Sequence, residues 1–154
     1  MTHPVLVLGI GNVLMSDDGA GVHAARGFDP LEDEALKVLD GGTLGLSLLV
    51  EVESCGALIV FDAASFGAEP GSVRTFMGEE MDAQLSGKKK TAHEVALFDL
   101  LATAELLGRK PERRALIGVE PDRIEWGLEP TTAVASAIPE MRRAARALIE
   151  GWAS

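Results

Sequence analysis

Two short runs of apolar residues constrain the fold of this chain more than any other feature. Residues 57–61 read Ala-Leu-Ile-Val-Phe without a polar residue in alternation, and residues 5–10 form a similar run that leads into the turn signal Gly11-Asn12. Strands with this pattern are buried on both faces. We therefore expect a parallel sheet that helices cover on each side.

Strand-type and helix-type segments alternate along the rest of the chain. Further strands are expected at residues 36–39, 72–77 and 114–119. The segment 72–77 alternates polar and apolar residues, which suits an edge strand and an antiparallel direction. Helices are expected at residues 16–28, 44–54, 91–108 and 134–152, and Pro139 should kink or restart the last one. This order predicts an α/β fold: a three-layer sandwich around a mostly parallel, twisted sheet of about five strands, with helices on both faces.

Length and composition exclude several classes of protein. The 154 residues, of which 47% are apolar, are expected to form a single domain over residues 1–154. A formal net charge of −10 repels phosphate groups, which argues against nucleic acid and anionic membranes as partners. We interpret the basic run Lys88-Lys89-Lys90 as a solvated loop rather than a docking patch.

The sequence favours a cytoplasmic location. Met1-Thr2-His3-Pro4 lacks the basic start of a signal peptide, and no stretch approaches the roughly 20 apolar residues of a membrane helix. The single cysteine, Cys55, cannot form an internal disulfide, in agreement with a reducing compartment. A monomer is compatible with the sequence, which does not indicate the oligomeric state.

Polar residues follow the expected strands at the edge where an α/β sheet opens its ligand-binding crevice. Asp17 and Asp18 follow the first strand, Asp40-Gly41-Gly42-Thr43 the second and Asp62 the third, while His93 begins the helix after the fourth. Carboxylates and imidazole together suit a borderline divalent cation such as nickel, copper or zinc. The positive end of the helix dipole should keep the histidine neutral, which is its ligand form.

Each of these residues also has an ordinary structural interpretation. As single residues, the acids suit helix starts or turns, and His93 suits a partly exposed helix surface. The common hydrolase motifs are missing, because the sequence contains neither Gly-x-Ser-x-Gly nor His-Glu-x-x-His. Leu14 stands where a dinucleotide fingerprint requires its third glycine, which weakens a nucleotide-binding interpretation.

Six segments in this order, between residue 5 and about residue 145, resemble the nickel-iron hydrogenase maturation protease family, the hydrogenase-specific C-terminal endopeptidases. The segments are Leu8-Gly9-Ile10-Gly11-Asn12-Val13-Leu14, Asp17-Asp18-Gly19-Ala20-Gly21-Val22, Leu39-Asp40-Gly41-Gly42-Thr43-Leu44-Gly45, Ile59-Val60-Phe61-Asp62-Ala63, Thr91-Ala92-His93-Glu94 and Ile117-Gly118-Val119-Glu120-Pro121. The first three are specific, whereas the strand-three aspartate alone is not.

The resemblance implies an endopeptidase that removes a C-terminal peptide from the nickel-loaded precursor of a hydrogenase large subunit. The nickel in the substrate would be the recognition signal, presented by the precursor rather than held tightly by the protease. By the family pattern, Asp18, Asp62 and His93 are the metal-contacting and catalytic residues. The family often has glutamate at the first position, so that either Asp17 or Asp18 could reach the metal in this chain.

The resemblance also implies a substrate-recognition role for Asp17 and for Asp40, Gly41, Gly42 and Thr43. A cation between the acids and the histidine could polarise the scissile carbonyl or lower the pKa of a water, while a free aspartate accepts a proton. Two alternatives remain: a nucleotide or small-molecule binding module that uses the Gly-rich first loop, and a nickel-binding accessory protein without peptidase activity. Only the enzyme would shorten a nickel-loaded precursor.

Overall fold

The computed structural model describes residues 5–29, 36–42, 48–87 and 91–153. The strands within these ranges are β1 (Val5–Ile10), β2 (Leu36–Gly42), β3 (Ala57–Ala63), β4 (Val73–Met77) and β5 (Arg113–Val119). The helices are the 3₁₀ helix η1 (Ser16–Gly19) and the α-helices α1 (Ala20–Arg26), α2 (Leu49–Ser54), α3 (Glu79–Ser86), α4 (Ala92–Leu106) and α5 (Thr132–Ala153). This alternation of strands and helices confirms the predicted α/β class.

The strands form one mixed sheet in the order β2-β1-β3-β5-β4. β1 pairs in parallel with β2 and β3, and β3 pairs in parallel with β5. β4 runs antiparallel to β5 at the edge of the sheet, as its alternating pattern predicted. Every residue of β3 is buried, because helices cover both faces of this inner strand, and this explains its unbroken apolar run.

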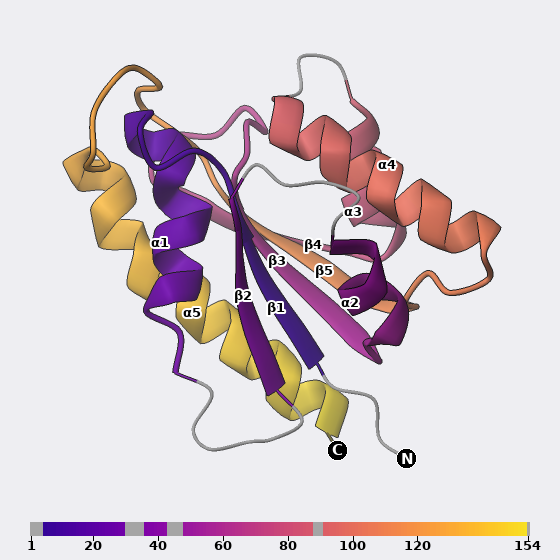
Figure 1. Ribbon diagram of the computed structural model, residues 1–154. Helices are drawn as coiled ribbons and strands as arrows, with labels where there is room; N and C mark the ends of the chain where they lie inside the picture. Colours follow the sequence, from indigo (N-terminus) through magenta and orange to yellow (C-terminus); the bar gives the residue numbers. More distant parts are fainter. Residues whose placement is uncertain (1–4, 30–35, 43–47, 88–90, 154) are drawn as a thin grey trace.

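The helices form two layers, one on each face of the sheet (Figure 1). α1 and α5 pack together on one face, over a core that includes Ile59 and Met141. α2, α3 and α4 cover the other face, over a core that includes Leu58 and Leu100. Neighbouring residues of β3 therefore serve opposite cores, as the two-residue period of a strand requires. The predicted three-layer sandwich is confirmed.

The strand order reverses between β1 and β3, and this reversal creates the crevice for a site. β2 lies on one side of β1 and β3 on the other, while the two connecting helices, α1 and α2, cover opposite faces. Helices that leave in opposite directions open a gap beyond the carboxyl ends of these strands. α1 packs directly against the strand backbones here, because a Cβ on Gly21 would lie only 2.2 Å from the Phe61 carbonyl oxygen.

Three elements differ from the sequence-based expectation. α3 forms where we predicted a polar loop, since its two buried residues, Met81 and Leu85, are four apart in an otherwise polar segment. β2 continues through Gly42 rather than ending before it, because Asp40 still pairs with Gly9 of β1. Pro139 lies inside one continuous helix, α5, which is anchored on either side of the proline by buried residues.

Some predictions fall on residues that the structure does not describe. Thr43, the start of the helix expected at residues 44–54, and the basic run 88–90 lie outside the described ranges. Within those ranges, no helix has both the length and the apolar character needed to cross a membrane.

Candidate active site

The structure brings Asp18, Asp62 and His93 together at the carboxyl edge of the sheet. Asp62 lies near the end of β3, Asp18 in η1 after β1, and His93 in the first turn of α4. The Nε2 atom of His93 is 3.2 Å from Asp62 Oδ1 and 3.5 Å from Asp18 Oδ1. All three side chains are buried, with 0% of Asp62 and 4% of His93 exposed, so that His93 is not the partly exposed helix residue of the ordinary interpretation.

A capping box fixes the start of α4 and therefore the position of His93. The backbone N–H and the hydroxyl of Thr91 both donate to Glu94 Oε1, at 3.2 and 2.9 Å. The backbone N–H of Glu94 donates in return to the Thr91 hydroxyl oxygen at 3.3 Å. The sequence predicted this reciprocal pair, which satisfies donors that would otherwise be unpaired at the helix start.

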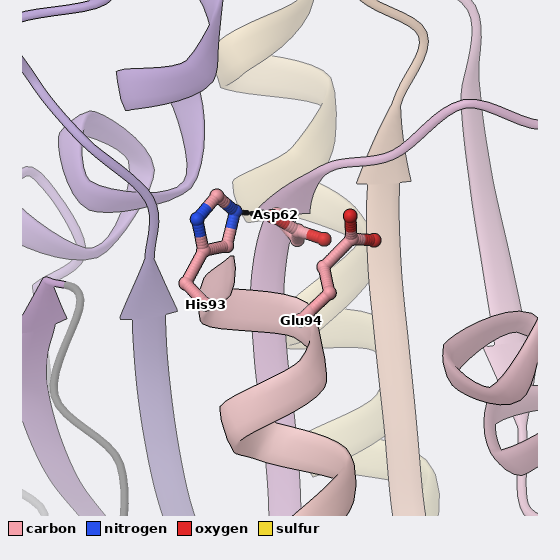
Figure 2. A group of neighbouring side chains, drawn as sticks. All are labelled: Asp62, His93 and Glu94. Atoms are coloured by element: carbon pink, nitrogen blue, oxygen red, sulfur yellow. Dashed lines mark hydrogen bonds and ion pairs between the residues drawn. The ribbon is translucent and has the colours of Figure 1, made fainter. Parts of the chain in front are cut away.

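Glu94 is the residue of the site that the sequence reasoning missed. Its side chain is 3% exposed, and Figure 2 shows its carboxylate directed toward Asp62, beside His93. Potential ligand atoms of Asp62, His93 and Glu94 all lie within 4.8 Å of one another. That described group does not include Asp18, which approaches His93 separately. The capping-box pattern explained the presence of Glu94 by its structural role alone. A second role for its other carboxylate oxygen was therefore not considered.

Three carboxylate oxygens in this cluster are buried without a hydrogen-bond partner in the described part of the chain. They are Asp18 Oδ1, Asp62 Oδ2 and Glu94 Oε2. Buried carboxylate oxygens are costly unless a donor or a cation compensates them. Carboxylates with one imidazole match the ligand preferences of nickel or zinc, so the residues present fit a divalent cation.

Burial and mutual proximity shift the pKa values of the cluster. Burial raises the pKa of Asp62 well above its ordinary value, the Glu94 carboxylate adds to this, and the His93 hydrogen bond opposes it. Burial also raises the pKa of Asp18. For His93, burial alone would lower the pKa, but the hydrogen bond and charge of Asp62 raise it overall. The neighbouring carboxylates thus act on the His93 pKa in the direction opposite to the predicted effect of the helix dipole.

The structure distinguishes the roles of the adjacent acids Asp17 and Asp18. Asp17 is 0% exposed, and its carboxylate accepts hydrogen bonds from the backbone N–H groups of Asp122, Arg123 and Thr131 and from the Thr131 hydroxyl. These bonds lower its pKa although burial alone would raise it. This burial argues against a direct contact of Asp17 with a substrate. Asp18 is the acid that faces His93.

The loop that carries Asp18 is braced rather than capped. Ser16 was expected to cap a helix, but its hydroxyl donates to the Glu125 carbonyl oxygen at 2.8 Å and the α-helix begins only at Ala20. Backbone hydrogen bonds of 2.8 and 2.9 Å join Ser16 and Leu14 to Gly127. Ser16 has a φ of 51°, an uncommon conformation for a residue with a side chain, which these contacts stabilise.

The Gly-rich first loop is shaped around Asp18 rather than around a phosphate. Gly11 has a φ of 133°, and a Cβ there would lie 2.0 Å from the Asp18 carbonyl oxygen, so only glycine fits. The backbone N–H of Asn12 donates to Asp18 Oδ2 at 3.1 Å. An amide that a nucleotide phosphate would require is thus already paired with a carboxylate.

Asp40 lies at the rim of a hollow beside the first loop. The hollow has a volume of about 320 Å³ and is lined by Gly11, Asn12, Val13, Leu14, Val22, Arg26 and Asp40. Arg26 forms an ion pair with Asp40 at 2.8 Å, and both side chains are partly exposed. Gly41 permits close packing of the strand end, because a Cβ there would lie 2.7 Å from Leu8 Cδ1. Asp40 is thus accessible in a way that Asp17 is not.

Comparison with known proteins identifies the family. The family described as "HycI: Hydrogenase maturation protease" matches residues 25–147. The chain is 42% identical over 151 residues to the hydrogenase expression/formation protein HupD of Rhodobacter capsulatus, with 90% of this chain and 71% of that protein covered. It is 34% identical over 132 residues to the hydrogenase 2 maturation protease of Escherichia coli strain K12, with 82% and 80% covered.

A solved structure agrees with the sequence comparisons. The hydrogenase maturating endopeptidase HybD from E. coli has a TM-score of 0.88 and 30% identity to this chain, with 96% of this chain and 93% of that chain covered. The structural similarity covers nearly the whole of this chain. Both the binding-module and the non-peptidase alternatives are set aside. The chain belongs to the hydrogenase maturation protease family and is an endopeptidase, a hydrolase that cleaves peptide bonds.

Proposed function

We propose that this endopeptidase removes a C-terminal peptide from the nickel-loaded precursor of a nickel-iron hydrogenase large subunit. Family membership supports the reaction, and the name of the E. coli relative, a hydrogenase 2 maturation protease, supports the substrate class. The observation that carries the proposal is the buried cluster of Asp18, Asp62 and His93, in which carboxylate oxygens have no hydrogen-bond partner within the described part of the chain. We place the reaction in the cytoplasm, with the precursor as the partner and no role for nucleic acid.

The nickel is treated as part of the substrate, which brings it to the cluster. Two carboxylates and one imidazole would contact it and leave coordination positions for groups of the precursor. Groups of the precursor would complete the coordination, so the site would distinguish a loaded precursor from an empty one. Asp18, Asp62 and His93 are therefore assigned both metal contact and catalysis.

The remaining chemistry is assigned to the chain's own carboxylates. A divalent cation at such a site supplies electrophilic polarisation of a carbonyl. A carboxylate whose pKa lies above its ordinary value is a better proton acceptor and donor near neutral pH. Asp62 keeps one carboxylate oxygen, Oδ2, without a hydrogen-bond partner in the described part of the chain, so it is our choice for the group that accepts a proton during hydrolysis. The braced loop keeps Asp18 aligned with His93 throughout.

Substrate recognition outside the cluster is assigned to the end of β2 and the segment after it. Asp40, Gly41, Gly42 and Thr43 were expected to contact the precursor, and Asp40 borders the hollow beside the first loop. A peptide segment of the precursor that lies in this hollow would pass close to the loop that holds Asp18. Asp17 acts indirectly, because it holds residues 122–131 against that loop.

The test compares three reactions of the purified full-length protein. One uses a nickel-free precursor, one uses the same precursor with protease that was preincubated with nickel, and one uses a nickel-loaded precursor. Shortening of the loaded precursor alone, followed by mass spectrometry of the released C-terminal peptide, is the expected result. If the nickel-free precursor is cleaved at a similar rate, nickel is not the recognition signal and the protein is a general peptidase.

A further inference from the structure

Glu94 carries one more negative oxygen than its structural task requires. Its Oε1 atom accepts both hydrogen bonds from Thr91 and completes the cap of α4. Its Oε2 atom is buried and has no hydrogen-bond partner in the described part of the chain. A neutral glutamine can make the same capping contact through a single oxygen. The second oxygen of Glu94 therefore takes no part in the hydrogen bonds of the cap.

The position of this second oxygen indicates that Glu94 can bind a cation. Glu94 lies within 4.8 Å of potential ligand atoms of Asp62 and His93, and its side chain is only 3% exposed. Asp62 Oδ2 is also buried and has no hydrogen-bond partner in the described chain, and the two carboxylates lie close to each other (Figure 2). Two buried like charges repel, and a cation that contacts both removes the repulsion and the desolvation cost together.

We infer that Glu94 is a further protein ligand for the divalent cation, joining Asp62 and His93, and that Thr91 is the positioning residue that aims it. The inference rests on the proposed function, because it concerns the same cation. The cap holds Oε1 on Thr91, which leaves Oε2 as the only carboxylate oxygen of Glu94 free to turn toward Asp62. The cation would then meet three carboxylates, from Asp18, Asp62 and Glu94, and one imidazole.

This ligand set changes what the site selects. Three carboxylates carry enough negative charge to balance a dication and the positive end of the helix dipole. If only Asp18 and Asp62 contacted the cation, the charge of the Glu94 carboxylate would not be balanced by it. Hard oxygen ligands around a single imidazole also disfavour copper(I), which prefers thiolates and thioethers. Glu94 thus contributes to selectivity for a divalent ion as well as to affinity.

The test measures nickel(II) binding by the isolated full-length protein, independently of cleavage. Nickel(II) is paramagnetic, so selective broadening of amide resonances around the cluster reports binding even in the millimolar range. We compare the wild type with Glu94→Gln, which keeps the cap, and with Asp82→Asn, which removes one charge far from the site. Thermal unfolding and circular dichroism verify that each variant is folded.

Glu94→Gln should weaken nickel binding by at least about tenfold, the lower end of what even outer-shell substitutions cost at metal sites. Asp82→Asn should leave the affinity within about twofold of the wild type. Thr91→Ala should weaken binding and Thr91→Ser should restore it, because serine retains the hydroxyl that holds Oε1. A purely structural role for Thr91 would lower the unfolding temperature without this selective loss and recovery of nickel affinity.

Several outcomes would overturn the inference. Nickel binding by Glu94→Gln that equals wild-type binding would show that Glu94 is not a ligand. A wild type whose amide resonances around the cluster are not broadened by nickel would exclude the inference as well. Failure of the proposed function is a separate result. If Glu94→Gln lowers the nickel affinity but the wild type does not cleave the loaded precursor, Glu94 remains a ligand and the proposed activity is refuted. Conversely, if the wild type cleaves the loaded precursor and Glu94→Gln binds nickel with unchanged affinity, the proposed activity stands and the assignment of Glu94 as a ligand is refuted.

Discussion

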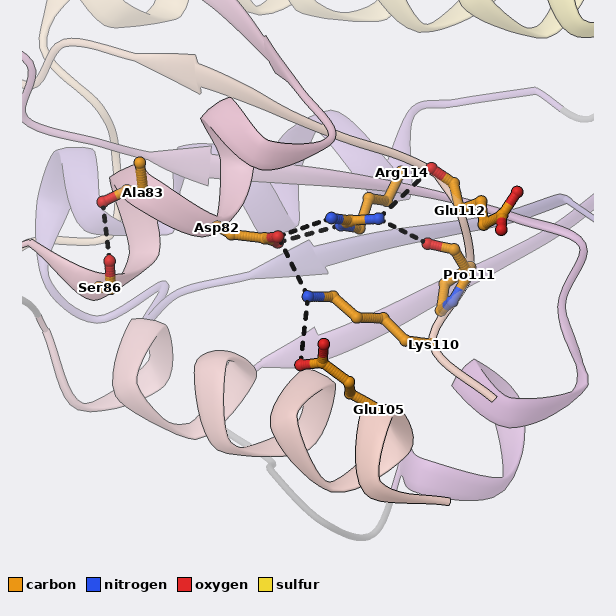
Figure 3. Close-up of polar contacts among 8 residues, drawn as sticks. All are labelled: Asp82, Ala83, Ser86, Glu105, Lys110, Pro111, Glu112 and Arg114. Atoms are coloured by element: carbon orange, nitrogen blue, oxygen red, sulfur yellow. Dashed lines mark hydrogen bonds and ion pairs between the residues drawn. The ribbon is translucent and has the colours of Figure 1, made fainter. Parts of the chain in front are cut away.

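The charged clusters near the two ends of strand β5 differ in how their carboxylates are paired. At its start, Arg114 donates to both carboxylate oxygens of Asp82 at 3.0 and 2.6 Å, and Lys110 contacts the same carboxylate at 3.1 Å (Figure 3). Near its end, Gly118 pairs with Asp62, whose carboxylate has one histidine contact and one unpartnered oxygen in the described chain. The Asp82 carboxylate is thus paired with two cationic side chains, whereas the second cluster holds buried carboxylate oxygens without a hydrogen-bond partner in the described residues.

The pKa values follow the same division. Burial alone would raise the pKa of Asp82, but hydrogen bonds from Arg114 and Lys110 bring it below its ordinary value. Burial raises the pKa of Asp62 well above that value. Paired charges stabilise a fold, while a buried acid without sufficient partners is retained at the cost of stability and indicates a functional site. The same substitution, aspartate to asparagine, therefore has opposite expected effects at the two ends.

Asp62→Asn should have the largest effect on activity. It removes a metal contact and the proposed proton acceptor, and it should reduce cleavage of the nickel-loaded precursor by at least about a hundredfold. The unfolding temperature should stay the same or rise, because a neutral amide replaces a buried, partly unpaired carboxylate. Cleavage and thermal unfolding are measured on the same preparation. A lower unfolding temperature would mean that Asp62 stabilises the fold, and the contrast with Asp82 would fail.

Asp17→Asn should disturb both stability and activity. An amide presents one acceptor oxygen, so some of the bonds to Asp122, Arg123 and Thr131 are lost from a buried position. We expect a loss of about 2–3 kcal/mol in the free energy of unfolding, as for buried hydrogen bonds to a charged group. Cleavage should fall less than in Asp62→Asn, because Asp17 acts through the loop that carries Asp18. Urea unfolding and the precursor assay measure the two effects, and an unchanged free energy of unfolding would contradict the bracing role.

The architecture was predictable from the sequence because it depends on local patterns. The unalternated run in β3, the capping box before α4 and the position of each acid after a strand were sufficient for the sheet, the helix start and the approach of Asp62 to His93. Parallel sheets open a crevice at the carboxyl ends of their strands, and this rule predicted where the residues that follow the strands would meet.

What the sequence did not reveal depends on contacts between distant segments. Asp17 looked like a helix-start acid, but its partners lie more than a hundred residues later in the chain. Ser16 had the composition of a cap, yet it joins the segment around Gly127. Helix α3 was missed because its apolar residues are too few for a clear period and their burial depends on the sheet. Contacts of this kind are determined by tertiary packing, so they produce no sequence motif with a fixed spacing.

Asp82→Asn should have an intermediate effect that is confined to stability. The Asp82 and Arg114 side chains are 27% and 12% exposed, so we expect a loss of about 1–2 kcal/mol in the free energy of unfolding, between the values for exposed and fully buried pairs. The cleavage rate should not change.

The effect of Asp82→Asn should also depend on pH. Because the folded-state pKa of Asp82 is lowered, its contribution is present above the ordinary pKa of 3.8 and is lost as the pH falls through the folded value. Wild type and variant should therefore converge in stability as the pH falls below 3.8. Urea unfolding at neutral pH and at a series of pH values below 3.8 gives the comparison, and a difference that stays constant throughout would show that the charge is not responsible.

Asp40→Asn should have the smallest effect on stability and so gives the cleanest test of substrate contact. The Arg26 and Asp40 side chains are 55% and 35% exposed, and an ion pair of this kind contributes less than about 1 kcal/mol. Any substantial change in cleavage therefore reflects the precursor rather than the fold. If Asp40 contacts the precursor, KM should rise severalfold while kcat and the unfolding temperature stay close to wild type, because the cluster around His93 is untouched. Arg26→Gln is the matched control, since it breaks the same ion pair from the other side and keeps the carboxylate. Equal changes in KM for both variants would assign the effect to the ion pair, and no change in either would remove Asp40 from the recognition surface.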